Sequence, residues 1–238
     1  MNGVKTILKI IDFGKNTYQY EIDFRFDCIS TATVRRIVDN LLISKKRFSV
    51  VAKEESTNQT VLTEGQGTPQ SPVFQVKIGL DKILLWTGWN VPYEKWQQWR
   101  SSVFADLQVL TQEIQTEMVL ACASQYAFIV PADKLKHGNQ IPELAPVRAF
   151  YARAVPEELL ERYNAFLAFG DTSGKEALSF YVGPGPQTPD EGNITFNFRW
   201  NTFDKNIKLE QNLLAHAARS DRLLELFHAG LLSLLIKS

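Results

Sequence analysis

The chain has 238 residues, of which 45% are apolar and 22% are charged. These proportions are typical of a packed globular protein and exclude a disordered chain. Lysine plus arginine and aspartate plus glutamate both number 26, and this balance argues against extensive nucleic-acid contact, because each phosphate contact needs a cation.

The first half of the chain alternates strand and helix patterns. Strands are predicted where apolar and polar residues alternate, and helices where apolar residues recur every three or four positions. In chain order the predicted elements are a strand at 17–26, a helix at 30–42 capped by Ser30 or Thr31, a polar loop at 55–72 with a short strand at 61–62, strands at 74–78 and 82–87, and a long helix that starts at Asn90 with Pro92 in its first turn and runs to Ile114.

The second half repeats this order of elements. Its glycine- and proline-rich stretch at 183–192 predicts a loop between two strands. The predicted elements are strands at about 117–130 and 146–155, a short helix that starts at Pro156, includes Leu167 and ends near Gly170, strands at 177–182 and 193–200, and a final helix from about Asn206 with a seam from Leu209 to Leu234.

The predicted strands have one apolar and one polar face, as an antiparallel sheet allows. We therefore expect an α+β protein in which two long helices lie across one or more antiparallel sheets. The order of elements predicts two halves, 1–116 and 117–238, in one compact unit. It also raises the hypothesis of two pseudo-repeats of β-β-α-β-β-α type, which rests on order alone.

Three local features resemble a known family. Tyr93-x-x-Trp96 enters a helix, an apolar strand surrounds Gln125 and Tyr126, and His228 lies on the final helix. Together these features resemble a sporadically distributed bacterial family of uncharacterised proteins of similar length, over about residues 74–238. The resemblance implies no activity, because none is known for that family.

Reactive or metal-binding histidines are not predicted. His216 and His228 lie twelve residues apart on one predicted helix, roughly 18 Å along its axis, so they cannot share a metal. His137 lies in a polar loop. We interpret all three as surface or helix-edge residues and predict no catalytic residue, metal or cofactor.

A carboxylate site is the main enzymatic alternative. Glu21 and Asp23 lie on one face of a predicted strand, about 7 Å apart, and Asp27 follows. Such a pair can perform acid and base catalysis, as in a hydrolase. A solvated face in which Arg25 pairs with Asp23 and Asp27 is the simpler interpretation.

Aromatic and basic residues provide candidate contacts for a partner. The cluster of Trp86, Trp89, Tyr93, Trp96 and Trp99 is either a core corner or a surface that binds another protein. Arg148 and Arg153 flank Tyr151, a pattern that can stack nucleic-acid bases. The candidate interaction residues are Trp89, Tyr93, Trp96, Arg148, Tyr151 and Arg153.

The compartment follows from the cysteines and from the absence of long apolar runs. Cys28 and Cys122 have apolar neighbours, which favours buried free thiols, although a disulfide or a redox pair stays open. Neither a signal peptide nor a membrane span is predicted. We expect a cytoplasmic, non-enzymatic interaction protein that uses a sheet face or the aromatic corner to bind another protein or a second copy of itself. A hydrolase with a carboxylate site and a nucleic-acid-binding protein are the alternatives.

Overall fold

Nine strands form one sheet in the order β2-β3-β4-β5-β1-β6-β9-β8-β7, and all neighbouring strands are antiparallel. This arrangement confirms the prediction of an α+β protein with an antiparallel sheet. The computed structural model describes residues 15–25, 29–44, 46–56, 58–68, 71–107, 118–131, 166–170, 175–184 and 191–227. The strands are β1 (Lys15–Phe24), β2 (Val50–Glu54), β3 (Gln59–Glu64), β4 (Phe74–Ile78), β5 (Lys82–Thr87), β6 (Val119–Pro131), β7 (Phe166–Gly170), β8 (Glu176–Pro184) and β9 (Glu191–Trp200).

The alternation in the sequence sets which face each strand buries. In β1 the side chains of Tyr18, Tyr20 and Ile22 are buried, whereas Glu21 and Asp23 between and after them are only partly covered. The same alternation holds in β4 and β5. One face of the sheet is therefore apolar and needs a covering layer.

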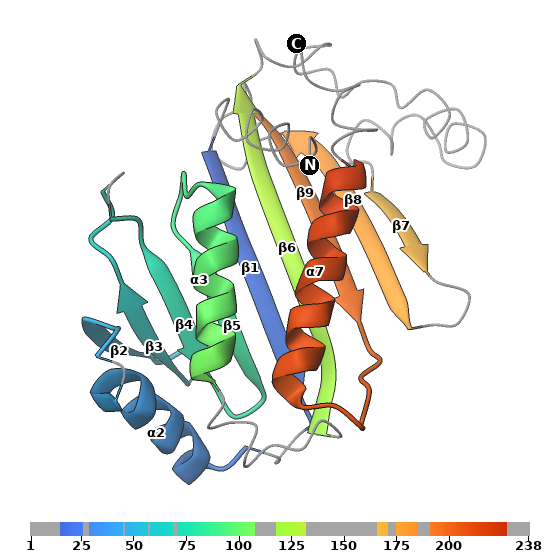
Figure 1. The fold of residues 1–238 in the computed structure, drawn as a ribbon. Helices are drawn as coiled ribbons and strands as arrows, with labels where there is room; N and C mark the ends of the chain where they lie inside the picture. Colours follow the sequence, from blue (N-terminus) through green and yellow to red (C-terminus); the bar gives the residue numbers. More distant parts are fainter. Residues whose placement is uncertain are drawn as a thin grey trace, which may run out of the picture.

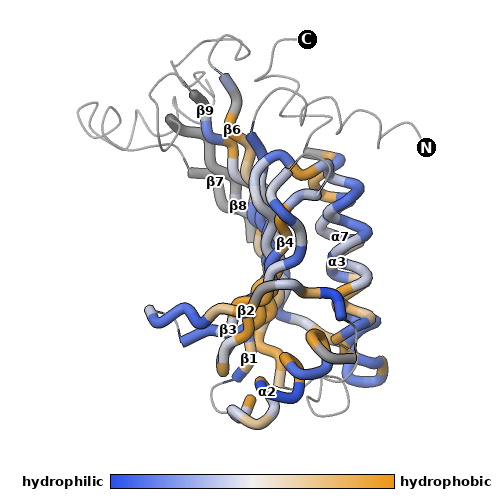
Figure 2. The backbone as a smooth tube through the Cα atoms, turned by 90° about the vertical axis from the view of Figure 1, so that its left-hand side faces the viewer, coloured by the Kyte–Doolittle hydropathy of each residue, from blue (hydrophilic) through white to orange (hydrophobic). Residues whose placement is uncertain are grey.

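Two helices provide that layer. Figure 1 shows α3 (Tyr93–Asp106) and α7 (Leu209–Phe227) side by side across the same face of the sheet. The view from the side agrees, with both helices on one side of the strands (Figure 2). The seam predicted for the last helix is buried where it is described, at Leu209, Leu213, Ala217, Ser220 and Leu224.

The third helix lies near the β2 edge (Figure 1). It is α2 (Thr31–Asp39), and the Ser30 side chain caps it by accepting a hydrogen bond of 3.1 Å from the Thr33 backbone N–H. This confirms Ser30 as the cap. A π-helical turn, η1 (Asn40–Ser44), follows α2 directly. Among the described residues no helix is both long enough and apolar enough to cross a membrane.

Three predicted boundaries are wrong. The polar loop at 55–72 contains the six-residue strand β3, not a short one, because β2 and β4 satisfy its backbone on both sides. Helix α3 starts after Pro92, and Asn90 takes a left-handed turn conformation with φ of 62°. Residues 166–170, predicted to end a helix, form the edge strand β7 paired with β8. The predicted strand at 146–155 and the start of the helix at Pro156 lie outside the described residues.

Strands β1 and β6 meet at the centre of the sheet. Tyr18 lies opposite Tyr126 and Gln19 opposite Gln125. Both tyrosines point to the helix-covered face and are fully buried. The strands of the first half and those of the second half therefore join through a single antiparallel ladder, and α3 and α7 lie above it on either side (Figure 1).

Candidate functional site: a buried charge network and an open groove

A largely buried carboxylate joins α3 and α7 to the sheet. Asp221 of α7 accepts hydrogen bonds from three side chains of α3: Tyr93 Oη at 2.5 Å, Gln97 Nε2 at 2.9 Å and Arg100 Nη2 at 2.7 Å. It also accepts one from Tyr126 Oη of β6 at 3.0 Å. Both carboxylate oxygens are therefore occupied by donors from the protein itself.

The charges of this network stabilise each other. The Arg100 side chain is 2% exposed and that of Asp221 is 14% exposed. Burial alone would raise the pKa of Asp221, but the Arg100 guanidinium and the other donors outweigh it and lower that pKa. Burial opposes the charge of Arg100, and Asp221 again outweighs burial and keeps the pKa of Arg100 above its ordinary value. Both groups remain charged and hold α3 against α7.

His216 lies beside this network and is fully buried, so the prediction of a surface or helix-edge residue is wrong for this histidine. Its Nδ1 is 2.6 Å from Tyr20 Oη, and its ring stacks on Phe198 with centroids 5.1 Å apart. Burial, followed by the nearby Arg100 charge, lowers the pKa of His216 to about 3. The imidazole is therefore neutral in the folded protein. His137 and His228 lie outside the described residues.

The described cysteine is a core residue. Cys122 is a free thiol with no exposed surface, and burial raises its pKa well above the ordinary value. Such a thiol is a poor nucleophile, because the thiolate is the reactive form. Cys28 lies outside the described residues. In the described part of the chain no three His, Cys, Asp or Glu side chains gather in a way that could hold a metal ion.

The candidate carboxylates of β1 are each paired with a cation. Glu21 lies 3.5 Å from Lys82 Nζ, and Asp23 lies 3.0 Å from Arg199 Nη2. The expected pairing of Asp23 with Arg25 is therefore wrong, because β5 and β9 bring Lys82 and Arg199 close to the two carboxylates of β1. Burial, and then the nearby Asp23 charge, raise the pKa of Glu21. Asp27 lies outside the described residues.

The candidate aromatic contacts separate into core and surface residues. Tyr93 is 3% exposed and Trp96 has no exposed surface, whereas Trp89 is 48% exposed. Tyr93 and Trp96 therefore offer a partner almost no surface, and Trp89 is the described candidate that does. Arg148, Tyr151 and Arg153 lie outside the described residues.

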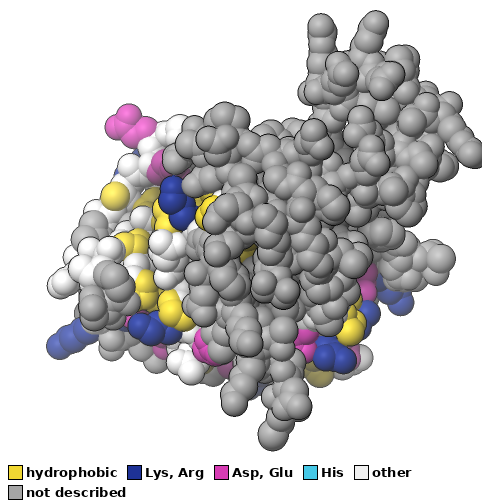
Figure 3. Space-filling model, turned by 90° about the horizontal axis from the view of Figure 1, so that it is seen from above, with side chains coloured by type: hydrophobic (Ala, Val, Ile, Leu, Met, Phe, Trp, Pro, Cys, Tyr) yellow, Lys and Arg dark blue, Asp and Glu magenta, His cyan; other side chains and the backbone are white. Residues whose placement is uncertain are grey.

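Two of the described basic residues, Arg35 and Arg47, are held in ion pairs. Arg47 bonds Glu64 and Asp106, at 2.7 and 3.0 Å, and Arg35 lies 3.9 Å from Asp39. Figure 3 shows basic, acidic and hydrophobic side chains interspersed on the described surface in that view.

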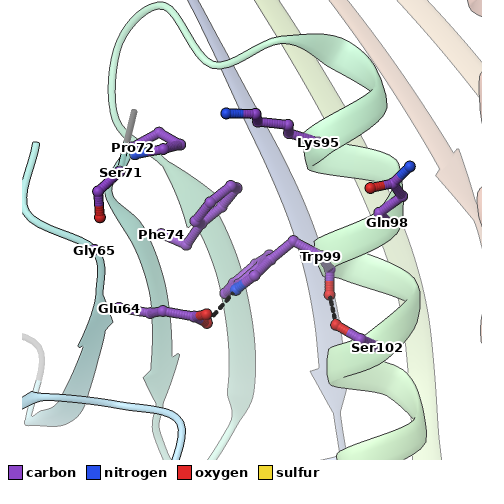
Figure 4. Close-up of a pocket in the computed structure, with 9 residues that line it drawn as sticks. All are labelled: Glu64, Gly65, Ser71, Pro72, Phe74, Lys95, Gln98, Trp99 and Ser102. Atoms are coloured by element: carbon purple, nitrogen blue, oxygen red, sulfur yellow. Dashed lines mark hydrogen bonds between the residues drawn. The ribbon is translucent and has the colours of Figure 1, made fainter. Parts of the chain in front are cut away.

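An open groove of 520 Å³ lies between α3 and the connection from β3 to β4 (Figure 4). Its base is the stacked pair of Trp99 and Phe74, whose ring centroids are 4.7 Å apart. Lys95 extends from α3 toward Pro72 across the upper end of the groove (Figure 4). The remaining lining residues are Glu64, Gly65, Ser71, Gln98 and Ser102.

The spacing of residues along α3 determines which of them form one side of the groove. Lys95, Gln98, Trp99 and Ser102 follow each other at intervals of three, one and three residues, so they share one face of α3. This face lies beside the stripe of Tyr93, Trp96 and Arg100 that packs on the sheet. Sequence reasoning missed the groove because the spacing predicts which residues share a face but not which segment lies opposite.

The opposite wall depends on a glycine. Gly65 has φ of 93°, and a Cβ at this position would lie 2.0 Å from the Pro72 carbonyl oxygen. Gly67 has φ of 78°, but a Cβ there would meet only Val73 Cγ2 at 3.5 Å. The backbone at Gly65 can therefore lie this close to the Pro72 carbonyl only because residue 65 has no side chain.

We expect Gly65→Ala to lower the free energy of unfolding more than Gly67→Ala. Both changes place alanine in a left-handed conformation, which costs about 1–3 kcal/mol. Only the first also forces Pro72 to move. Urea titrations of the two variants and the parent measure this difference. Equal losses would show that the contact between Gly65 and Pro72 does not constrain the wall of the groove.

Comparisons with known proteins add little to this geometry. The fold defines an α+β protein with one antiparallel sheet covered on one face by α3 and α7. No family model matches the chain, and no curated protein does. Among solved structures, the chain has a weak likeness to the extracellular domain of the putative histidine kinase mmHK1S-Z2, with 11% identity over 81% of this chain and 78% of that chain and a TM-score of 0.16. A likeness at this level carries no argument about function.

Proposed function

We propose that this protein is a non-enzymatic interaction module that binds a segment of a partner protein in the groove between α3 and the β3–β4 connection. The groove itself carries the proposal. Its 520 Å³ fall within the roughly 300–1,000 Å³ of typical ligand sites, and it combines an aromatic base with polar side chains at its edge. Such a combination is typical of surfaces that bind peptides.

The titratable groups described above favour binding over catalysis. A general acid or base must reach the substrate, but Asp221 is saturated by its four neighbours and His216 is buried and neutral. The hydrolase alternative has less support, because Glu21 and Asp23 are both in ion pairs. The nucleic-acid alternative has less support for the same reason at Arg47.

We also propose that the two halves, 1–116 and 117–238, are pseudo-repeats, each ending in a long helix across its half of the sheet. The order of the strands supports this proposal. In the first half β5 returns to pair with β1 before α3, and in the second half β9 returns to pair with β6 before α7.

A cytoplasmic location is proposed on the free, buried Cys122, because thiols stay reduced in the cytosol.

A substitution that fills the groove with a large side chain tests the proposed function. Peptides selected from a displayed library on the immobilised protein would be synthesised with a fluorescent label, and their binding measured by anisotropy. We expect Ser102→Trp to weaken binding by about tenfold or more, because the indole occupies the volume that a ligand needs. Ser102 is exposed on α3, so the protein should fold with this change.

The matched control is Ser101→Trp. Ser101 is the exposed neighbour of Ser102 on α3 and does not line the groove. Its binding should equal that of the parent, and circular dichroism should show both variants folded. A selection that yields no binding peptide, or peptides that bind both variants equally, would contradict the proposal.

A further inference from the structure

We infer that the groove selects a partner segment that places an acidic side chain next to an apolar one. This inference rests on the proposed function, because it names the chemistry of the segment that occupies the same groove. It follows from the charges and ring contacts of the residues that line the groove.

The carboxylate that lines the groove, Glu64, already has hydrogen-bond partners within the protein. Its Oε2 accepts hydrogen bonds from Trp99 Nε1 at 2.6 Å and from Arg47 Nε at 2.7 Å. The Arg47 guanidinium also lies 5.5 Å from the Trp99 ring centroid and bonds Asp106 at 3.0 Å. The carboxylate of Glu64 is therefore held in place by the protein.

Lys95 is the cation at the edge of the groove. It is exposed on α3, and no carboxylate among the described residues lies within ion-pair distance of its ammonium group. Lys95 lies at the upper end of the groove and Glu64 at the lower end (Figure 4), so the end at Lys95 has a local positive charge. An acidic side chain of a partner complements this charge, and a basic one is repelled.

The aromatic rings that line the groove favour an apolar side chain on the ligand. Phe74 and Trp99 stack at the base with an angle of 16° between their planes, and Pro72 forms the upper wall (Figure 4). The Gly88 backbone N–H bonds the Val73 carbonyl at 2.8 Å, which places Gly88 beside the residue that follows Pro72. Trp89 comes next in the chain and is 48% exposed, so it follows at the same end of the groove as Pro72. Phe74 and Trp99 are 8% and 5% exposed, and an apolar side chain of a partner can bury against the small part of the rings that lines the groove.

The test compares one selected peptide with its amide analogue, in which each Asp becomes Asn and each Glu becomes Gln. We expect the parent protein to bind the acidic peptide about twofold to fivefold more tightly, the range of a partly exposed ion pair. Lys95→Gln should remove that preference, and Lys95→Glu should reverse it. The control Lys208→Glu changes an exposed lysine that precedes α7 and should leave the preference intact.

The outcomes separate this inference from the proposed function. If Ser102→Trp blocks peptides that bind with no acidic preference, the groove binds protein but the inference is wrong. The inference is also wrong if the Lys95→Gln variant still prefers the acidic peptide. Sedimentation of the protein alone identifies a second copy as the occupant: a dimer in the parent that becomes a monomer in Ser102→Trp would contradict the choice of a separate acidic partner.

Discussion

Asp221→Ala is expected to lower the free energy of unfolding by about 3–5 kcal/mol. The change leaves the Arg100 guanidinium buried without its counter-ion, and breaking one side of a buried ion pair costs about this amount. Tyr93, Gln97 and Tyr126 lose their acceptor at the same time. Chemical denaturation at neutral pH measures the loss.

The adjacent residue provides the control. The Arg222 side chain is 61% exposed and pairs with Glu225 within the same helix, so Arg222→Ala should change stability by less than about 0.5 kcal/mol. The double replacement Arg100→Met with Asp221→Leu removes both charges and should recover part of the loss. If Asp221→Ala is as stable as the parent, the network does not hold α3 against α7.

His216→Phe is expected to make the protein less sensitive to mild acid. The folded protein holds His216 at a pKa of about 3, against 6.5 for an unperturbed histidine, so the unfolded chain binds one more proton between these values. The stabilisation from neutral His216 is complete above pH 6.5 and is lost as pH falls, by about 1.4 kcal/mol per pH unit. Phenylalanine keeps the stacking on Phe198 but cannot be protonated.

Urea titrations at pH 7, 6 and 5 measure this slope. The parent should lose stability on acidification more steeply than the variant, even though His216→Phe lowers stability at pH 7 by removing the bond with Tyr20. Glu21 has the opposite effect on the pH dependence of stability, because its raised pKa lets the folded protein keep a proton. Since Glu21 is present in both proteins, its effect cancels when their slopes are compared. Equal slopes would mean that His216 is protonated in the folded state.

The sequence predicts local structure well where a single pattern dominates. The alternation around Tyr18 to Phe24 and the spacing from Leu209 to Leu224 match β1 and α7. The predictions fail where tertiary contacts determine the secondary structure. Residues 166–170 fit a helix by their apolar spacing, but pairing with β8 makes them a strand, because a short apolar run fits either structure until a neighbouring strand is known.

The site is harder to predict, although some signals are present. His216 lies three residues after Leu213 and therefore on the seam of α7, and Arg100 lies four after Trp96 on the buried stripe of α3. A polar residue in an apolar stripe indicates a buried partner. What the sequence does not reveal is that partner, because Arg100 and Asp221 lie roughly 120 residues apart and meet only when both helices pack on the sheet.

The ladder between β1 and β6 has a consequence for how the chain reaches its folded state. Its paired residues are separated by roughly 100 positions in the sequence, and contacts between such distant positions slow folding, because a large loop must close first. On the ribosome, β1 would emerge well before β6 and would expose an unpaired apolar edge in the meantime. Nascent chains that stop before β6 should therefore be prone to aggregate or to recruit chaperones.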